Sequence, residues 1–123
     1  MNKLIFATQN INKVREVREL LSNSFEILGL DDIGFKEELI EDKSTIIENS
    51  IKKAEFIKIK TGYDCFADDT GLEVNALNGQ PGVFSKRFAG PNASSDDNID
   101  KLLEMLGNNP NRAARFKTVI SLS

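Results

Sequence analysis

The sequence predicts an α/β fold with a mixed central sheet flanked by helices. Three observations support this prediction. A short continuous apolar run at residues 4–7 is typical of a strand buried on both faces. Helical periodicity follows it, and a second apolar run at residues 25–28 completes a β-α-β unit, which favours parallel pairing. The length of 123 residues corresponds to about one domain.

The first helix is expected directly after the first strand. Val14, Val17, Leu20 and Leu21 recur at helical spacing and predict its apolar face. Asn10 precedes this pattern and is the expected N-cap, because its side-chain oxygen can accept from backbone N–H groups of the first turn.

A second helix is expected after an acidic loop at residues 34–43. It begins near Ser44 or Thr45, because Thr45 and Glu48 have the spacing of a capping box, and it ends at Gly62. Its buried stripe is expected at four apolar positions: Ile47, Ile51, Ala54 and Ile57.

The stretch Asp68-Asp69-Thr70-Gly71 follows a short strand at residues 65–67. It is interpreted as a tight turn that places two carboxylates at the carboxyl end of that strand, with a strand resuming at residues 72–74. In open α/β sheets, ligands bind at this end. Paired carboxylates there can hold a hard metal ion, take a proton from water, or do both.

The remaining elements follow in order. Residues 78–82 form a turn, and residues 83–88 are expected to be extended. A third amphipathic helix, marked by Ile99 to Leu106, ends at Gly107. Residues 114–122 alternate as a strand, and the sequence stops there. We therefore expect residues 1–123 to be the N-terminal portion of a single longer domain.

Composition restricts the chemistry. The chain has no histidine and one cysteine, which excludes an internal disulfide and a Cys-based zinc site. A metal would have oxygen ligands, which favours Mg²⁺ or Mn²⁺. The net charge of −3 with interspersed signs argues against a nucleic-acid polymer or a membrane surface as partner. No apolar run is long enough to span a bilayer and no signal peptide is recognised, so a cytoplasmic location is expected.

The connection from the first strand to the first helix is a candidate phosphate site. It contains six residues: Thr8, Gln9, Asn10, Ile11, Asn12 and Lys13. A helix N-terminus offers free N–H groups and the positive end of a dipole. Lys13 opposes that dipole, which suggests a negatively charged ligand. The alternative is an N-cap asparagine beside a solvated lysine.

A second group of candidates surrounds the second helix. Among the acidic residues of the preceding loop, Glu41 is best placed to reach a metal, although most of them should be solvated. Asn49 and Lys53 are four residues apart and share a helical face. Lys53 could contact a phosphate, and the alternative is a surface ion pair. If Asp68 and Asp69 still belong to the strand, they point to opposite sides, and Asp68 then has a supporting role.

Four motifs occur together in the order and spacing of one family. They are Thr8-Gln9-Asn10 with Lys13, Glu48-Asn49 with Lys53-Ala54, Ala67 to Val74, and Gly79 to Ser85. With Arg112 to Phe116 as the next strand, the chain from residue 3 onward resembles the Ham1-like inosine triphosphate pyrophosphatases.

The resemblance implies Mg²⁺-dependent hydrolysis of noncanonical purine nucleoside triphosphates (ITP, dITP and XTP) to monophosphate and pyrophosphate, by a homodimer. It implies that Thr8 to Lys13 bind the triphosphate, that Asp69 is the proton acceptor and a metal ligand, and that Glu41 is a second metal ligand. Thr70 matches a substrate contact, and Lys53 matches a lysine near the phosphates. Gln9 and Thr70 depart from the family's usual glycine and serine.

Family members are about one and a half times as long as this chain, so the resemblance also implies a fold truncated by one lobe and part of the sheet. The base-recognising segments would lie beyond Ser123. Two alternatives to an enzyme stay open. One is a nucleotide- or metal-binding fragment without turnover. The other is a structural fragment stabilised by strand pairing, because an open sheet edge invites another strand.

Overall fold

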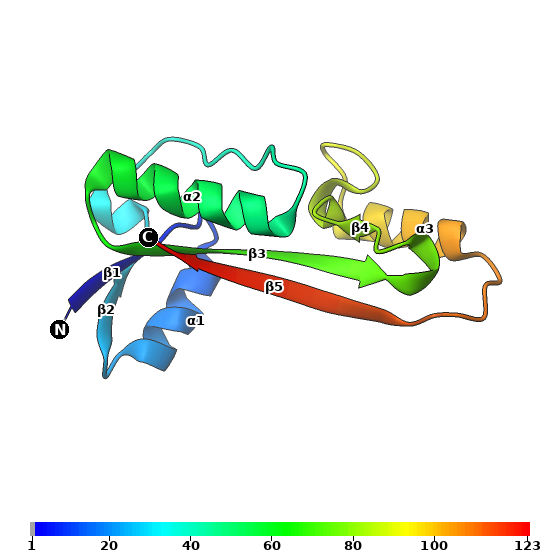
Figure 1. The fold of residues 1–123 in the computed structure, drawn as a ribbon, viewed down its shortest axis with the longest axis horizontal. Coiled ribbons are helices and arrows are strands. Elements are labelled where there is room, and N and C mark those ends of the chain that lie inside the picture. The colour runs from blue at the N-terminus through cyan, green and yellow to red at the C-terminus, as the bar shows by residue number, and fades with distance from the viewer. Residues whose placement is uncertain (1) are drawn as a thin grey trace. The chain divides into compact units, whose positions relative to one another are not determined.

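The computed structural model describes residues 2–123 and divides the chain into two compact units (Figure 1). The first unit contains the residues up to Lys43, Ile47–Asp69 and Val119–Ser123. The second unit contains Ser44–Ile46 and Thr70–Thr118. Within residues 2–123, no helix combines the length and the apolar character that crossing a membrane would require.

The first unit is built on parallel strands. β1 (Asn2–Phe6) pairs in parallel with β2 (Phe25–Leu28) on one side. On its other side β1 pairs in parallel with the start of β3 (Cys65–Val74), where Ile5 lies opposite Cys65. The strand order β2-β1-β3 confirms the predicted β-α-β opening.

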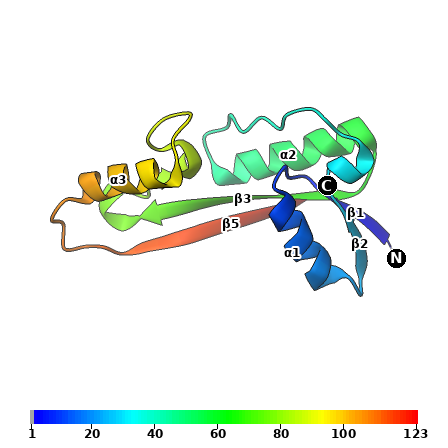
Figure 2. The same ribbon diagram turned by 180° about the vertical axis from the view of Figure 1, so that it is seen from behind.

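Helices cover both faces of these strands. α1 (Ile11–Leu21) and α2 (Ile46–Thr61) lie on opposite faces, as Figures 1 and 2 show from two sides. Alternation along the strands therefore builds two cores. The core on the α1 face contains Phe6, Val14, Ile27 and Phe66. The core on the α2 face contains Ile5, Ala7, Leu30, Leu39, Ala54, Ile57, Cys65 and Ala67.

Three apolar helix positions that we expected to be buried are exposed. Leu20 is 81% exposed, Ile47 is 47% exposed and Ile51 is 42% exposed. Ala54 and Ile57 of α2 are buried as predicted, and Asn49 and Lys53 are buried in place of Ile47 and Ile51. Their hydrogen bonds, described below, explain why polar side chains occupy that face.

The predicted tight turn at Asp68-Asp69-Thr70-Gly71 is wrong, because β3 continues through it without a break. The reason is pairing along the whole strand with β5 (Ala114–Leu122). Cys65 and Ser123 exchange N–H···O bonds of 2.9 and 2.8 Å, and near the other end the Asn75 N–H donates to Ala113 O at 3.0 Å. These bonds define an antiparallel pair that keeps β3 extended.

The second unit contains the end of β3, β4 (Pro81–Gly82) and α3 (Ser95–Leu106). Leu72 lies opposite Gly82 in an antiparallel pair. Gly71 permits this close approach, because a Cβ there would lie 2.3 Å from the carbonyl oxygen of Gly82.

The prediction of an extended segment at residues 83–88 is wrong, because it contains a short 3-10 helix, Ser85–Arg87. The Ser85 hydroxyl donates to Gly82 O at 2.6 Å and accepts from the Leu72 N–H at 2.9 Å, which turns the chain back. The predicted turn before it is confirmed by positive φ angles at Asn78 and Gly79. α3 ends at Gly107 as predicted.

Candidate active site

The candidate residues of the first unit gather where β1 ends beside β3. In the order β2-β1-β3 the chain leaves β1 into α1 on one face and enters β3 from α2 on the other. This reversal is the position at which open α/β sheets bind ligands. The Ala7 N–H donates to Phe66 O at 2.8 Å, so the connection that leaves β1 starts beside the part of β3 that leads to Asp68. The carboxylates therefore reach the expected end of the sheet without a turn.

The connection between β1 and α1 is held by its own polar side chains. Asn10 Oδ1 accepts from the N–H groups of Asn12 at 3.0 Å and Lys13 at 3.2 Å, so Asn10 is the N-cap that the sequence predicted. Thr8 is buried, and its Oγ1 accepts from the Asn10 N–H at 3.1 Å. Gln9 Nε2 donates to Glu37 O at 3.3 Å. The Thr8 O–H and the Asn10 amide are the donors that this loop can offer to an anion.

Lys13 pairs with the first of the two aspartates. Its Nζ lies 2.9 Å from Asp68 Oδ2, and the two side chains are 35% and 12% exposed. The other oxygen, Asp68 Oδ1, is buried and has no hydrogen-bond partner within residues 2–123. Lys13 is thus held at the crevice with part of its side chain still open to solvent.

Lys53 is buried on the opposite face of the sheet. It is 6% exposed, and its Nζ donates to Glu41 Oε1 at 2.8 Å and to the backbone oxygen of Asp68 at 2.6 Å. The alternative of a surface ion pair is therefore wrong, because this pair lies at a buried ammonium group. Asn49, also buried, accepts from the Lys43 N–H at 2.9 Å.

Asp68 and Asp69 point to opposite faces, because they are successive residues of one continuous strand. Asp68 lies on the α1 face with Lys13. Alternation from Ala67, which packs in the α2 core, places Asp69 on the face of Lys53. Thr70 belongs to the second unit, where its hydroxyl oxygen lies 2.8 Å from the hydroxyl oxygen of Thr118 in β5.

The donor set fits a magnesium ion. No group of three histidine, cysteine, aspartate or glutamate side chains converges within residues 2–123. Mg²⁺ needs no such cage, because it is commonly bound by one or two carboxylates together with waters and phosphate oxygens. Glu41 and Asp69 offer carboxylate oxygens on the α2 face, whereas Asp68, whose Oδ1 has no hydrogen-bond partner within residues 2–123, lies on the α1 face.

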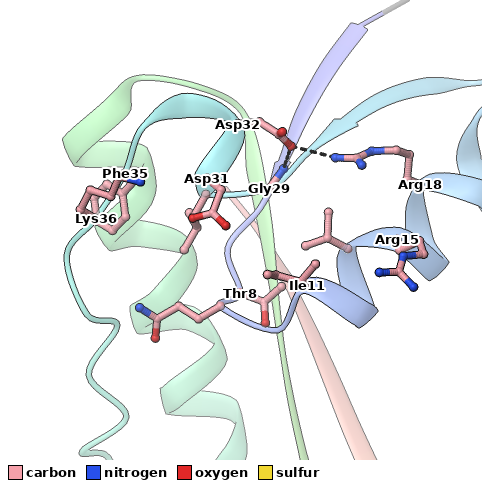
Figure 3. Close-up of a pocket in the computed structure, with 12 residues that line it drawn as sticks. Thr8, Ile11, Arg15, Arg18, Gly29, Asp31, Asp32, Phe35 and Lys36 are labelled. Carbon is pink, nitrogen blue, oxygen red and sulfur yellow. Dashed lines mark hydrogen bonds and ion pairs between the residues drawn. The ribbon is translucent and has the colours of Figure 1, made fainter.

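A pocket of about 460 Å³ lies beside this site, between the β1–α1 loop, α1 and residues 29–36 (Figure 3). Arg18 forms part of its wall, because it donates to Ile27 O at 3.0 Å and lies 2.7 Å from Asp32. Of the predicted site residues only Thr8, Gln9 and Ile11 line the pocket. Sequence reasoning missed it, although its segment at residues 29–36 directly follows the carboxyl end of β2.

Cys65 takes no part in the chemistry. Its side chain is fully buried, and its Sγ lies 3.1 Å from Ala54 O. Burial raises the pKa of the Cys65 thiol, which disfavours the nucleophilic thiolate.

Known proteins are similar to this chain in sequence. The model of the Ham1 family matches residues 4–123. A dITP/XTP pyrophosphatase from Flavobacterium johnsoniae is 54% identical over 121 residues, which cover 98% of this chain and 63% of that relative.

Solved structures are similar as well. A Ham1 protein from Coxiella burnetii has a TM-score of 0.91 at 38% identity, and the Staphylococcus aureus Ham1 protein has a TM-score of 0.90 at 38% identity. Each match covers 99% of this chain and 63% of the other. The chain therefore spans less than two thirds of the length of these relatives, and the α/β fold predicted from its sequence is confirmed. The chain belongs to the Ham1 family.

Proposed function

We propose that this chain provides the phosphate-binding and hydrolytic part of an enzyme that converts noncanonical purine nucleoside triphosphates to monophosphate and pyrophosphate. The observation that carries the proposal is the ion pair between Lys13 and Asp68 beside the capped N-terminus of α1, with Asp69 next to Asp68 on β3. Relatives named dITP/XTP pyrophosphatase support the substrate class.

The β1–α1 connection would bind the triphosphate. Thr8 and Asn10 offer neutral donors, and the first turn of α1 adds backbone N–H groups. Lys13 adds a positive charge that stabilises the negative charge developing on the pyrophosphate leaving group. Gln9, Ile11 and Asn12 complete this loop, and Thr70 is proposed as a further substrate contact.

Asp69 would act as the base. Its carboxylate accepts a proton from the attacking water as the water oxygen bonds to phosphorus, and the P–O bond to pyrophosphate breaks. When bound, Mg²⁺, or Mn²⁺ in its place, offsets phosphate charge. Glu41 and Asp69 are the residues proposed to hold it. Asp68 supports the site by pairing with Lys13.

Phosphate release tests the proposal. ITP, XTP, ATP and GTP are each incubated with the chain, Mg²⁺ and inorganic pyrophosphatase, and phosphate is measured. We expect turnover of ITP and XTP that falls by at least about a hundredfold in Asp69→Asn, because general-base catalysis contributes about 10²–10⁴-fold. Binding of ITP without turnover would favour the nucleotide-binding alternative. If the chain neither binds nor hydrolyses ITP, the remaining alternative is a structural fragment stabilised by strand pairing.

We also propose that the protein acts as a homodimer in the cytoplasmic nucleotide pool. Three apolar residues of β5, Phe116, Ile120 and Leu122, are 78%, 66% and 76% exposed, which supports association with further protein surface. Sedimentation velocity at several protein concentrations tests this. A monomer at every concentration would contradict both the dimer and the strand-paired alternative.

A further inference from the structure

Two threonine hydroxyl groups meet across neighbouring strands of the second unit. Thr70 of β3 and Thr118 of β5 have their hydroxyl oxygens 2.8 Å apart, and either group can donate the hydrogen bond. Thr70 is proposed above as a substrate contact, whereas Thr118 has no role in the proposed function. Thr118 is therefore a hydroxyl group beside the site that the mechanism does not yet use.

The register of the strands brings these two side chains close, because β5 runs beside β3 (Figure 1). The Asn75 N–H donates to Ala113 O at 3.0 Å, so Asn75 lies opposite Ala113, and counting back along the antiparallel strands places Thr70 opposite Thr118. Opposite residues alternate between hydrogen-bonded and non-hydrogen-bonded pairs, and an odd number of positions separates these two pairs. Thr70 and Thr118 thus form a non-hydrogen-bonded pair, whose side chains approach most closely and can bond through their hydroxyl groups.

The hydrogen bond to Thr118 can fix the direction of the Thr70 hydroxyl group. Both threonines are exposed, so core packing does not hold them. A threonine side chain has three staggered positions about its Cα–Cβ bond, and the bond across the strands favours the one that brings the two oxygens together. A hydroxyl group has one proton and two lone pairs, so Thr70 can bond to Thr118 and to a ligand at the same time.

We propose that Thr118 is a positioning residue, which holds the Thr70 hydroxyl group in the orientation that meets the substrate. The inference deepens the proposed function and rests on it, because the orientation of Thr70 matters for binding only if Thr70 contacts the nucleotide. The effect has an upper limit. If the hydroxyl group occupied all three staggered positions equally, the competent one would fall to about a third, and the apparent affinity would fall by about threefold.

The orientation of Thr70 is measured without substrate. Three-bond NMR couplings to the Thr70 methyl carbon in isotope-labelled protein report the population of each staggered position. We expect one dominant position in the wild type, averaged couplings in Thr118→Val, and wild-type couplings in Thr118→Ser, because serine keeps the hydroxyl group. Valine has the shape of threonine and is favourable in strands, so the strand itself should not change.

Turnover of ITP tests what the orientation is for. Thr118→Val should raise KM by about threefold and leave kcat unchanged, because a contact weakened equally in bound substrate and transition state affects binding alone. A residue that only stabilises the fold would instead lower the amount of active enzyme, and with it kcat. The matched control is Thr61→Val, which removes a hydroxyl group that donates to Ile57 O at 2.7 Å in α2 and should leave KM unchanged.

A double-mutant cycle tests whether Thr118 acts through Thr70. In a Thr70→Val background, Thr118→Val should cause no further rise in KM, since no hydroxyl group remains to be oriented. A further rise of about the same size would overturn the inference. Equal Thr70 couplings in wild type and Thr118→Val, with ITP turnover present, would also overturn it and leave the proposed function intact. Absent ITP turnover in the wild type contradicts only the proposed function, since the couplings are read without substrate.

Discussion

The two faces of the first unit's sheet handle charge in opposite ways. On the α1 face the core is apolar, and its only pair with a site aspartate, Lys13 with Asp68, lies at the edge with the lysine 35% exposed. On the α2 face a lysine is buried inside the packing, with its ammonium on Glu41 and a backbone oxygen. The first lysine is partly open to solvent, and the second is enclosed by the fold.

This difference teaches how two lysines in one site can have separate tasks. An exposed lysine can exchange partners at low cost, because water compensates each lost contact. A buried lysine cannot, because a lost contact leaves a desolvated charge. Burial therefore determines how costly it is for each lysine to change its partner.

The largest effect is expected in the apolar cores. Phe66 is 7% exposed and stacks on Phe6 with ring centroids 4.4 Å apart on the α1 face. Phe66→Ala should lower the free energy of unfolding by about 3–5 kcal/mol, measured by urea denaturation. Ile57→Ala, in the α2 core, should cost about 2–5 kcal/mol, and Leu20→Ala at the surface less than about 0.5 kcal/mol. A small effect of Phe66→Ala would mean that the α1 face is loosely packed.

The next effect concerns the exposed cation. Lys13→Met should weaken binding of inorganic tripolyphosphate by roughly tenfold, because one charge-assisted contact is lost. Lys58→Met is the matched control. Lys58 also pairs with an aspartate, Asp64, at 2.8 Å, but Asp64 precedes the first residue of β3. Calorimetry of both variants measures the difference. Equal affinities of wild type and Lys13→Met for tripolyphosphate would mean that Lys13 does not bind phosphate.

A smaller effect is expected at the start of α1. Asn10→Ala removes the cap that accepts from the Asn12 and Lys13 N–H groups and should destabilise the chain by about 1 kcal/mol. Asn10→Asp keeps an acceptor and should cost much less in thermal unfolding. If both substitutions weaken phosphate binding equally, the Asn10 amide NH₂ is itself a ligand group.

The smallest effect is a pH dependence beside the α2 face. The hydrogen bond from Lys58 and its positive charge lower the pKa of Asp64 below its usual 3.8. The unfolded chain therefore takes up this proton first as the pH falls. The stabilisation is present above about pH 4 and is lost below it. Asp64→Asn should remove this part of the acid sensitivity, as measured by unfolding between pH 5 and pH 2. An unchanged profile would mean that the pair contributes nothing.

The sequence predicted the first unit well because its signals are local. Asn10 caps α1, Gly62 follows α2 with a positive φ, and the apolar runs become β1 and β2. The prediction of a turn at residues 68–71 was wrong. Local residue types favour a turn there, whereas pairing with β5, which is distant in sequence, keeps the backbone extended. The predicted buried face of α2 was wrong at Ile47 and Ile51, because these residues match a helical stripe better than Asn49 and Lys53 do. Only their partners at Lys43 and Glu41 make the polar face favourable.

The unbroken course of β3 limits how this protein can vary in length. Asp68 and Asp69 lie on different faces of the sheet because successive side chains of the continuous strand alternate from Cys65 onward. Deleting Ala67 would shift both aspartates by one strand position while the residues before them keep their faces. Asp68 and Asp69 would therefore exchange faces. Asp69 would then lie on the face of Lys13, and Asp68 on the face of Lys53. Insertions and deletions that preserve the site must therefore fall in loops that carry none of its residues, such as the segment before α3.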